Sequence, residues 1–449
     1  MKHVLAGVFV GLLLMSVLAW KIQPAPASAG KIPLVWASDD NPVRRGQIAL
    51  FNKLHPECDL RLDPTPSGME KVIVQSLAGV GPDLFDCYDG YQLAAYVKSG
   101  IAWDLTKPLH AAGIDPGRDV WPAARPIFIL NGHVYGHATN VACNAILFHK
   151  EIFQRAGIPF PKGPWTWEQL LPIAKRLTVR DANGKAKQFG LMLDWDNNWP
   201  QFVFQWGGRF YTPDGTRCVL DSPQAIAGLQ FLHDLIYKYH VVPTPAEEAS
   251  IATQGGWGSG ALTFFGGKKG AMALGGRWWL CSLRTYPDLH LGAVECPDGP
   301  ARVYRGYGRA TLVNSKGLHR QKALEFIKYL ASQPYNDLIN HQADAVGPVI
   351  KSAYTSTYLH DPEYPQEDLN AVWRDVLQRG EPDEVSPFIN GQRAARIMKR
   401  QLDLVKNDQK PVAEALRDAA REVNAEIPKI LAMDPTLKAQ YEQVLKGRR

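Results

Sequence analysis

The segment FGGKKGAMALGGRWW, residues 265–279, decides how the rest of this sequence is interpreted. It opens with a glycine-rich turn that carries two lysines, and a run of small apolar residues follows at positions 271–274. That run is too short for a helix, and apolar runs between glycines are typical of buried strands. The two glycines after it allow the backbone to bend sharply or to lie close to another group. We therefore predict a buried strand that ends in a tight turn.

Three large side chains follow this turn, namely Arg277, Trp278 and Trp279. An aromatic ring at the end of a strand can form a platform for a flat, partly apolar ligand. The alternative is that both indoles are core residues, which is common for tryptophan. The glycine pair favours a ligand role for one of them. We predict that Arg277 and Trp278 contact a ligand, and that Trp279, on the opposite side of an extended chain, packs in the core.

The order of these features resembles a family signature: phenylalanine, a small Gly-Lys loop, Ala-Met, a strand and Gly-x-Trp. The family is that of the family 1 extracellular solute-binding proteins, the maltose-binding-protein-like receptors of ABC importers. In this family the tryptophan after the glycine stacks on a sugar ring, and Trp278 is the matching position. Residues 132–153, 302–313 and 345–349 are similar to the family's crossings between two lobes.

The resemblance covers nearly the whole chain after residue 30 and implies a two-lobed α/β fold with three interlobe crossings and a helical C-terminal region. It implies a monomeric receptor that captures a mono- or oligosaccharide outside the membrane and delivers it to the transmembrane subunits of an ABC permease. A non-sugar ligand such as a polyamine, a phosphodiester or a metal chelate is an alternative. The implied boundaries are a signal peptide at 1–29, lobe 1 at 30–141 and 302–347, and lobe 2 at 142–301 with C-terminal helices at 348–449.

Strand and helix signals alternate in the first part of the chain. The predicted strands are 32–36, 59–62 and 83–87, and the predicted helices are 43–55, 69–77 and 91–99. This order favours a parallel sheet with helices on its faces, in which ligands bind at the carboxyl ends of the strands. We predict ligand contacts there from Trp36, Asp39, Asp40, Asp86 and Tyr88.

Helix capping is the alternative role for the acids at these strand ends, because each stands shortly before a predicted helix. Capping explains Asp40 and Asp89 at least as well as ligand contact does. In the second crossing, Tyr307 beside a glycine-rich turn joins the predicted site.

Residues 193–208 interleave carboxylates, amides and indoles, a combination that suits polyols. We predict that Asp196 and Trp199 contact the ligand, as the matching region does in related receptors. Alternatively, Asp194 and Asp196 form the carboxylate pair of a glycoside hydrolase, since residues i and i+2 of a strand share a face. Trp257 stands among glycines at 255–260 and either reaches the ligand or belongs to an ordered lid.

Composition allows a large globular core without stabilising crosslinks. Apolar residues make up 45% of the 449 positions and charged residues 21%. The net charge of +6 is spread among acids, so we expect no nucleic-acid surface. The motifs HExxH, GxSxG, GxGxxG and CxxC do not occur, so we expect no enzyme, cofactor or metal site. The pairing of the six cysteines stays open, and buried free thiols are an alternative for Cys58 and Cys87.

The first residues predict export to the periplasm or another space outside the cytoplasmic membrane. Lys2 precedes an almost wholly apolar stretch at 4–20, and Ala27-Ser28-Ala29 is a small-x-small cleavage site. An uncleaved N-terminal anchor is the alternative. A lipid anchor is not expected, because the first cysteine is Cys58.

Cleavage after Ala29 predicts that protein purified from its native host begins at Gly30. N-terminal sequencing of the soluble extracytoplasmic fraction measures this directly. An intact Met1 or Lys2 terminus in the membrane fraction would instead identify the anchor.

Overall fold

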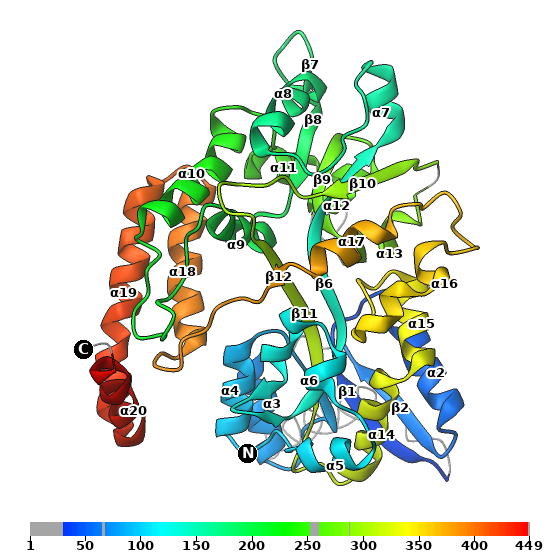
Figure 1. The fold of residues 1–449 in the computed structure, drawn as a ribbon, viewed down its shortest axis with the longest axis vertical. Helices are drawn as coiled ribbons and strands as arrows, with labels where there is room; N and C mark the ends of the chain where they lie inside the picture. Colours follow the sequence, from blue (N-terminus) through cyan, green and yellow to red (C-terminus); the bar gives the residue numbers. More distant parts are fainter. Residues whose placement is uncertain (1–29, 65–67, 252–259, 287, 448–449) are drawn as a thin grey trace, which may run out of the picture.

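The computed structural model describes residues 30–64, 68–251, 260–286 and 288–447. The secondary-structure elements form two α/β lobes joined by two long strands, and a group of helices ends the chain (Figure 1). One continuous sheet runs through both lobes in the order β2-β1-β3-β11-β6-β9-β8-β7, with β10 beside β6 and β12 beside β11. Among the described residues, no helix is long and apolar enough to cross a membrane.

Lobe 1 contains the parallel sheet that the sequence predicts. Strand β1 (Ile32–Ala37) lies between β2 (Cys58–Asp63) and β3 (Leu84–Cys87) and is parallel to both. The crossover helices are α2 (Arg44–Leu54) and α3 (Met69–Leu77), and α4 (Gly90–Lys98) follows β3. Shorter elements complete the lobe: α5 (Thr106–Ala111), α6 (Pro116–Asp119), η1 (Pro122–Ile127), β4 (Ile129–Leu130) and β5 (His133–Val134).

The long strands β6 (Gly136–His149) and β11 (Tyr304–Val313) connect the lobes. They pair antiparallel, and β11 continues the sheet of lobe 1 by pairing antiparallel with β3. Thirteen of the fourteen β6 residues are buried, as a strand covered on both faces requires. Both strands fall within the stretches that resemble interlobe crossings in the sequence.

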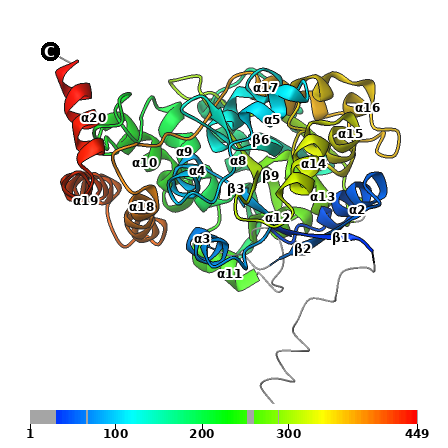
Figure 2. The same cartoon turned by 90° about the horizontal axis from the view of Figure 1, so that it is seen from below.

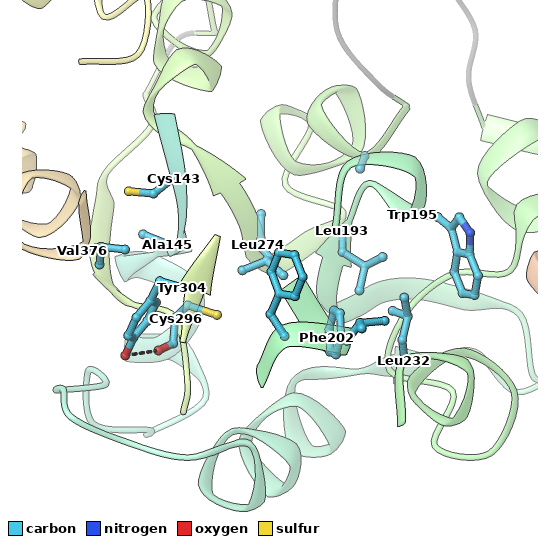
Figure 3. Close-up of a cluster of buried hydrophobic side chains, with 14 of the residues drawn as sticks. Cys143, Ala145, Leu193, Trp195, Phe202, Leu232, Leu274, Cys296, Tyr304 and Val376 are labelled. Carbon is cyan, nitrogen blue, oxygen red and sulfur yellow. Dashed lines mark hydrogen bonds between the residues drawn. The ribbon is translucent and has the colours of Figure 1, made fainter. Parts of the chain in front are cut away.

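Lobe 2 is built around β9 (Gly270–Gly276), which lies between β6 and β8 (Ala186–Leu193). Figure 3 shows its apolar core, in which Leu193, Phe202, Leu232 and Leu274 gather from different elements. The remaining elements are β7 (Val179–Arg180), β10 (Leu291–Glu295), α7 (Lys150–Arg155), α8 (Trp167–Leu177), α9 (Trp195–Gln205), α10 (Pro223–Tyr237), α11 (Pro245–Ile251), α12 (Gly260–Gly266), η2 (Arg277–Trp279) and α13 (Leu280–Leu283). Helix α8 begins with the predicted capping box of Thr166 and Gln169.

After β11 the chain adds two helices to lobe 1, α14 (Arg320–Ala331) and α15 (Gln333–Gln342), followed by η3 (Ile350–Tyr354) and α16 (Ser356–Leu359). Helix α17 (Asn370–Leu377) then packs against β6, and β12 (Gly380–Glu381) pairs with β11. The chain ends with α18 (Gly391–Lys406), α19 (Val412–Met433) and α20 (Pro435–Lys446). Figure 2 shows these three helices at one side of the molecule, where α19 packs against α10.

All six cysteines are free and buried, which confirms the free-thiol alternative for Cys58 and Cys87. Burial raises the pKa of the Cys87 and Cys143 thiols well above the usual value. These sulfur atoms therefore behave as small apolar core groups rather than as reactive thiolates.

Candidate ligand-binding cleft between the lobes

The glycine pair of β9 allows two indoles to fold back over the strand. A Cβ atom at Gly275 would lie 2.9 Å from the Trp279 ring, and one at Gly276 would lie 2.5 Å from the Trp278 ring. The expected extended chain after the glycines is wrong, because a 3-10 turn, η2, places both rings against the strand end. The predicted difference between the two indoles is nevertheless present, since Trp279 is 1% exposed and Trp278 is only half-buried.

Trp278 belongs to a hydrogen-bonded chain with Tyr307 and Asn144. Its Nε1 donates to the Tyr307 hydroxyl at 3.2 Å, and that hydroxyl donates to Asn144 Oδ1 at 3.0 Å. Burial raises the pKa of Tyr307 to about 12, so the hydroxyl stays protonated at neutral pH. The amide nitrogen of Asn144 is buried and finds no hydrogen-bond partner among the described residues. The structure thus brings two predicted site residues together, Trp278 from η2 and Tyr307 from the interlobe strand β11.

Arg277 is a structural crosslink, which corrects its predicted role in ligand binding. Its three guanidinium nitrogens donate to Asn370 Oδ1 at 2.8 Å, to Ala345 O at 2.7 Å and to Asn340 O at 2.7 Å. The guanidinium also lies over the Tyr358 ring, and the residue is 1% exposed. Burial lowers the pKa of Arg277 below its usual value. The side chain therefore joins η2 to α15 and α17 and offers no surface to a ligand.

Trp36 and Asp86 are also buried beneath the strand ends rather than displayed there. Trp36 has no exposed surface, and its Nε1 donates to Asp86 Oδ1 at 2.8 Å. Asp86 also accepts from the hydroxyls of Ser38 at 2.6 Å and Thr311 at 2.7 Å. Burial raises the pKa of Asp86 to about 7. The prediction that Trp36 contacts a ligand is therefore corrected, and the Asp86 oxygens are already engaged by the protein.

Asp39 lies at the edge of a buried ion cluster. Its carboxylate pairs with Arg44 at 2.8 Å and with Arg309, and its side chain is 30% exposed. Both arginines also approach Asp344, at 3.0 Å and 3.5 Å. Asp39 is thus the member of this cluster that both holds the arginines and keeps a surface for a ligand.

The remaining strand-end residues divide into a cap and two exposed side chains. Asp89 caps α4 by accepting from Gln92 N at 2.9 Å, as the capping alternative predicts. Asp40 does not cap α2, whose entry is instead shaped by the Asn41 side chain accepting from the backbone N–H two residues later. Asp40 is exposed, and Tyr88 is 46% exposed.

A cleft of about 610 Å³ lies between lobe 1, lobe 2 and the C-terminal helices. Trp199 and Asp196, both predicted from the sequence, line it. Trp199 stacks on Phe210 with ring centroids 5.0 Å apart, which gives lobe 2 an aromatic wall. The complete lining is Asp89, Tyr91, Asp196, Trp199, Pro200, Phe210, Tyr211, Arg305, Asp383, Glu384, Val385, Ser386, Gly391, Ala395, Met398, Lys399 and Leu402.

Ion pairs fix most of the charged groups in this cleft. Arg305 forms a two-pronged pair with Asp383 at 2.6 Å and 2.5 Å. Glu384 accepts from the backbone N–H of Phe210 at 2.6 Å. Asp196 is more than half exposed and lies 3.6 Å from Lys399. These charges hold the segment before α18 against lobe 2 and shape one wall of the cleft.

Asp194 and Asp196 do not share a strand face, because β8 ends at Leu193 and both residues belong to the start of α9. Asp194 caps that helix by accepting from Asp196 N at 3.2 Å, and it also accepts from Asn197 Nδ2 at 2.9 Å. The strand geometry on which the hydrolase alternative rested is therefore absent.

The cleft wall formed by residues 383–402 was not predicted from the sequence. That stretch carries ordinary signals for a loop and an amphipathic helix, and its packing partners are distant in the sequence. One local signal was present. Gly391 is a weak helix former, yet it lies in the first turn of the amphipathic helix α18, which indicates a close packing partner there. A Cβ atom there would lie 2.3 Å from Tyr91 Cβ. Trp257 lies outside the described residues.

The chain belongs to the bacterial extracellular solute-binding protein family, whose model matches residues 37–337. An arabinooligosaccharide-binding protein of Halalkalibacterium halodurans is 26% identical over 233 residues, 48% of each protein. The chain spans less than two thirds of the length of three curated relatives that it matches, namely 66%, 48% and 65%.

Two solved structures have the same fold. An ABC substrate-binding protein of Listeria monocytogenes in complex with cycloalternan has a TM-score of 0.75 at 18% identity, covering 88% of this chain and 98% of that one. UgpB of Mycobacterium tuberculosis in complex with glycerophosphocholine has a TM-score of 0.73 at 16% identity, covering 89% and 99%. These likenesses confirm the predicted two-lobed α/β fold with a helical C-terminal region.

The crosslink made by Arg277 predicts that Arg277→Met lowers the free energy of unfolding by about 3 kcal/mol or more, because three buried acceptors lose their donor. Chemical denaturation of the two proteins measures the difference. Arg45→Met is the matched control, since Arg45 is exposed and its loss should change stability by less than about 0.5 kcal/mol. Equal stability of the Arg277 variant and the native protein would contradict the crosslink.

Proposed function

We propose that this protein is the exported receptor of an ABC importer and that it binds a carbohydrate between its lobes. The observation that carries the proposal is the 610 Å³ cleft, in which aromatic rings and carboxylates face one another across the lobe junction. Indole and phenol rings cover the C–H faces of sugar rings, and carboxylates accept hydrogen bonds from sugar hydroxyls. A few polar groups in an otherwise aromatic and apolar pocket is the usual form of a small-molecule site.

Two of the three ligands named above for similar proteins are carbohydrates, and the third, glycerophosphocholine, is a glycerophosphodiester. One relative is named for arabinooligosaccharides, and one structural neighbour was solved with cycloalternan. The catalytic alternative has no support from the geometry of Asp194 and Asp196, and we propose binding without chemical conversion.

The proposed ligand contacts come from both lobes and from the strands between them. Asp196 and Trp199 of lobe 2 line the cleft itself. Asp39, Asp40 and Tyr88 of lobe 1 and Trp278 of lobe 2 are proposed as further contacts outside that lining. Tyr307 contributes from β11, where its hydroxyl is fixed by Trp278 and Asn144. Asp86 acts indirectly by holding the strand ends.

Ligand binding would couple to a hinge motion about β6 and β11, with lobe boundaries near residues 141, 301 and 347. One buried core lies wholly within lobe 1, and a second runs from lobe 1 along β6 and β11 into lobe 2, so the bending would be confined to these two strands. A ligand that contacts both lobes stabilises the closed form in proportion to its extra affinity for that form. The closed form would then be presented to the permease.

The proposal is tested with a panel of neutral and amino mono- and oligosaccharides, polyamines and glycerophosphodiesters. We expect calorimetric titration to detect binding of at least one sugar and of neither other class. Small-angle scattering with that sugar at saturation should give a smaller radius of gyration than the free protein does. The proposal fails if no sugar binds, or if the bound sugar is hydrolysed.

The two indoles after the glycine pair should have separable roles. Trp278→Ala should weaken sugar binding by roughly tenfold, because an indole stacked on a sugar contributes on the order of 1–2 kcal/mol. Trp279→Ala should leave affinity nearly unchanged and lower the free energy of unfolding by about 3–5 kcal/mol, because the ring is buried. Titration and denaturation of both variants measure the difference. Normal sugar binding by Trp278→Ala would show that the η2 turn is structural only.

A further inference from the structure

Asp89 is the carboxylate of the cleft that the protein leaves without a cation. Four carboxylates line the cleft, namely Asp89, Asp196, Asp383 and Glu384, against two cations, Arg305 and Lys399. Arg305 is held by Asp383, and Lys399 is held by Asp403 at 2.9 Å with Asp196 at 3.6 Å. Among the described residues, Asp89 has hydrogen bonds on its own helix but no ion pair.

This charge arrangement sets what the cleft can accept. Both lining cations already have carboxylate partners, so an anionic ligand would have to displace one of them. A protonated amine, in contrast, would neutralise Asp89 and lower the cost of burying its charge. The rings of Tyr91 and Trp199 line the same cleft, and aromatic faces attract ammonium groups.

We propose that the ligand is an amino sugar, either free or within an oligosaccharide, and that Asp89 binds its protonated amine. This inference rests on the proposed carbohydrate-binding function and narrows its ligand class. The sugar rings are covered by the aromatic wall around Trp199, and the amine determines which sugars bind tightly.

The protonation of Asp89 makes the inference measurable. Burial, together with the nearby Asp383 carboxylate, raises the pKa of Asp89 to about 7. The other groups that face it are Tyr91 and Gln92 on its own helix, with Arg305 held beyond Asp383. An ammonium group binds the ionised carboxylate, so affinity for the amino sugar should rise about fivefold from pH 6 to pH 7. A neutral hydroxyl that accepts a hydrogen bond from the protonated carboxyl group would show the opposite trend.

Asp89→Asn is a precise test variant because asparagine caps helices as well as aspartate does. The native protein and this variant are titrated with glucosamine and its β-1,4-linked oligomers, their N-acetylated counterparts, the neutral sugar panel and spermidine. We expect the best amino sugar to bind the native protein at least tenfold more tightly than its N-acetylated counterpart. In the variant this preference and the pH dependence should disappear, while weak sugar binding remains. Asp434→Asn is the matched control, because Asp434 caps α20 in the same way and does not line the cleft, and this variant should retain both.

The outcomes separate this inference from the proposed function. Tighter binding of neutral or N-acetylated sugars would overturn the amino-sugar assignment and leave a carbohydrate receptor. An amino-sugar preference that survives in Asp89→Asn would overturn the role of Asp89. Binding of spermidine with no sugar bound, or no binding at all, would overturn both proposals.

Discussion

The arrangement of lobe 1 around the end of β11 depends on a largely buried cluster of two guanidinium groups and three carboxylates. Arg44 at the start of α2 and Arg309 on β11 face Asp39, Asp86 and Asp344 from three other segments. Isolated buried charges are costly, and removing one partner from such a cluster leaves another charge uncompensated. The cluster therefore forms only when four segments are correctly placed, namely the ends of β1 and β3, strand β11 and the chain after α15. It fixes the strand ends that carry the lobe 1 residues we propose as ligand contacts.

Much of the fold follows from local sequence signals. The parallel strands of lobe 1 were predictable because short apolar runs alternate with amphipathic helices, and the capping box fixed the start of α8. The β9 strand was predictable from its glycine boundaries. The different burial of Trp278 and Trp279 was also predicted, although the reason given was wrong. An extended chain was assumed, whereas a 3-10 turn folds both rings back over the glycines.

The parts of the site that the sequence did not predict depend on partners far along the chain. Arg277 follows a strand end, where a cation suggests a ligand contact, but its acceptors lie 63 to 93 positions away. Trp36 is covered by α14 through Phe326, with ring centroids 4.9 Å apart. Nothing local to residues 383–402 indicates that they pass beside the cleft. Periodicity shows which face of an element is apolar, but it does not show which distant segment covers that face.

The segment around Asp89 links ligand recognition to the contact between lobe 1 and the C-terminal helices. Asp89 caps α4, and the second residue of that helix, Tyr91, lies against Gly391 at the start of α18. Gly90 is similarly close to Val385, since a Cβ atom there would lie 3.3 Å from the valine side chain. Separation of the lobes must break these contacts, and they adjoin the carboxylate that we assign to the ligand. A ligand group bound at Asp89 would therefore act at the point where the two halves of the cleft already touch. A Cβ atom at Gly391 would clash with Tyr91. The glycine therefore allows α4 and α18 to pack closely, and a larger side chain there would force them apart.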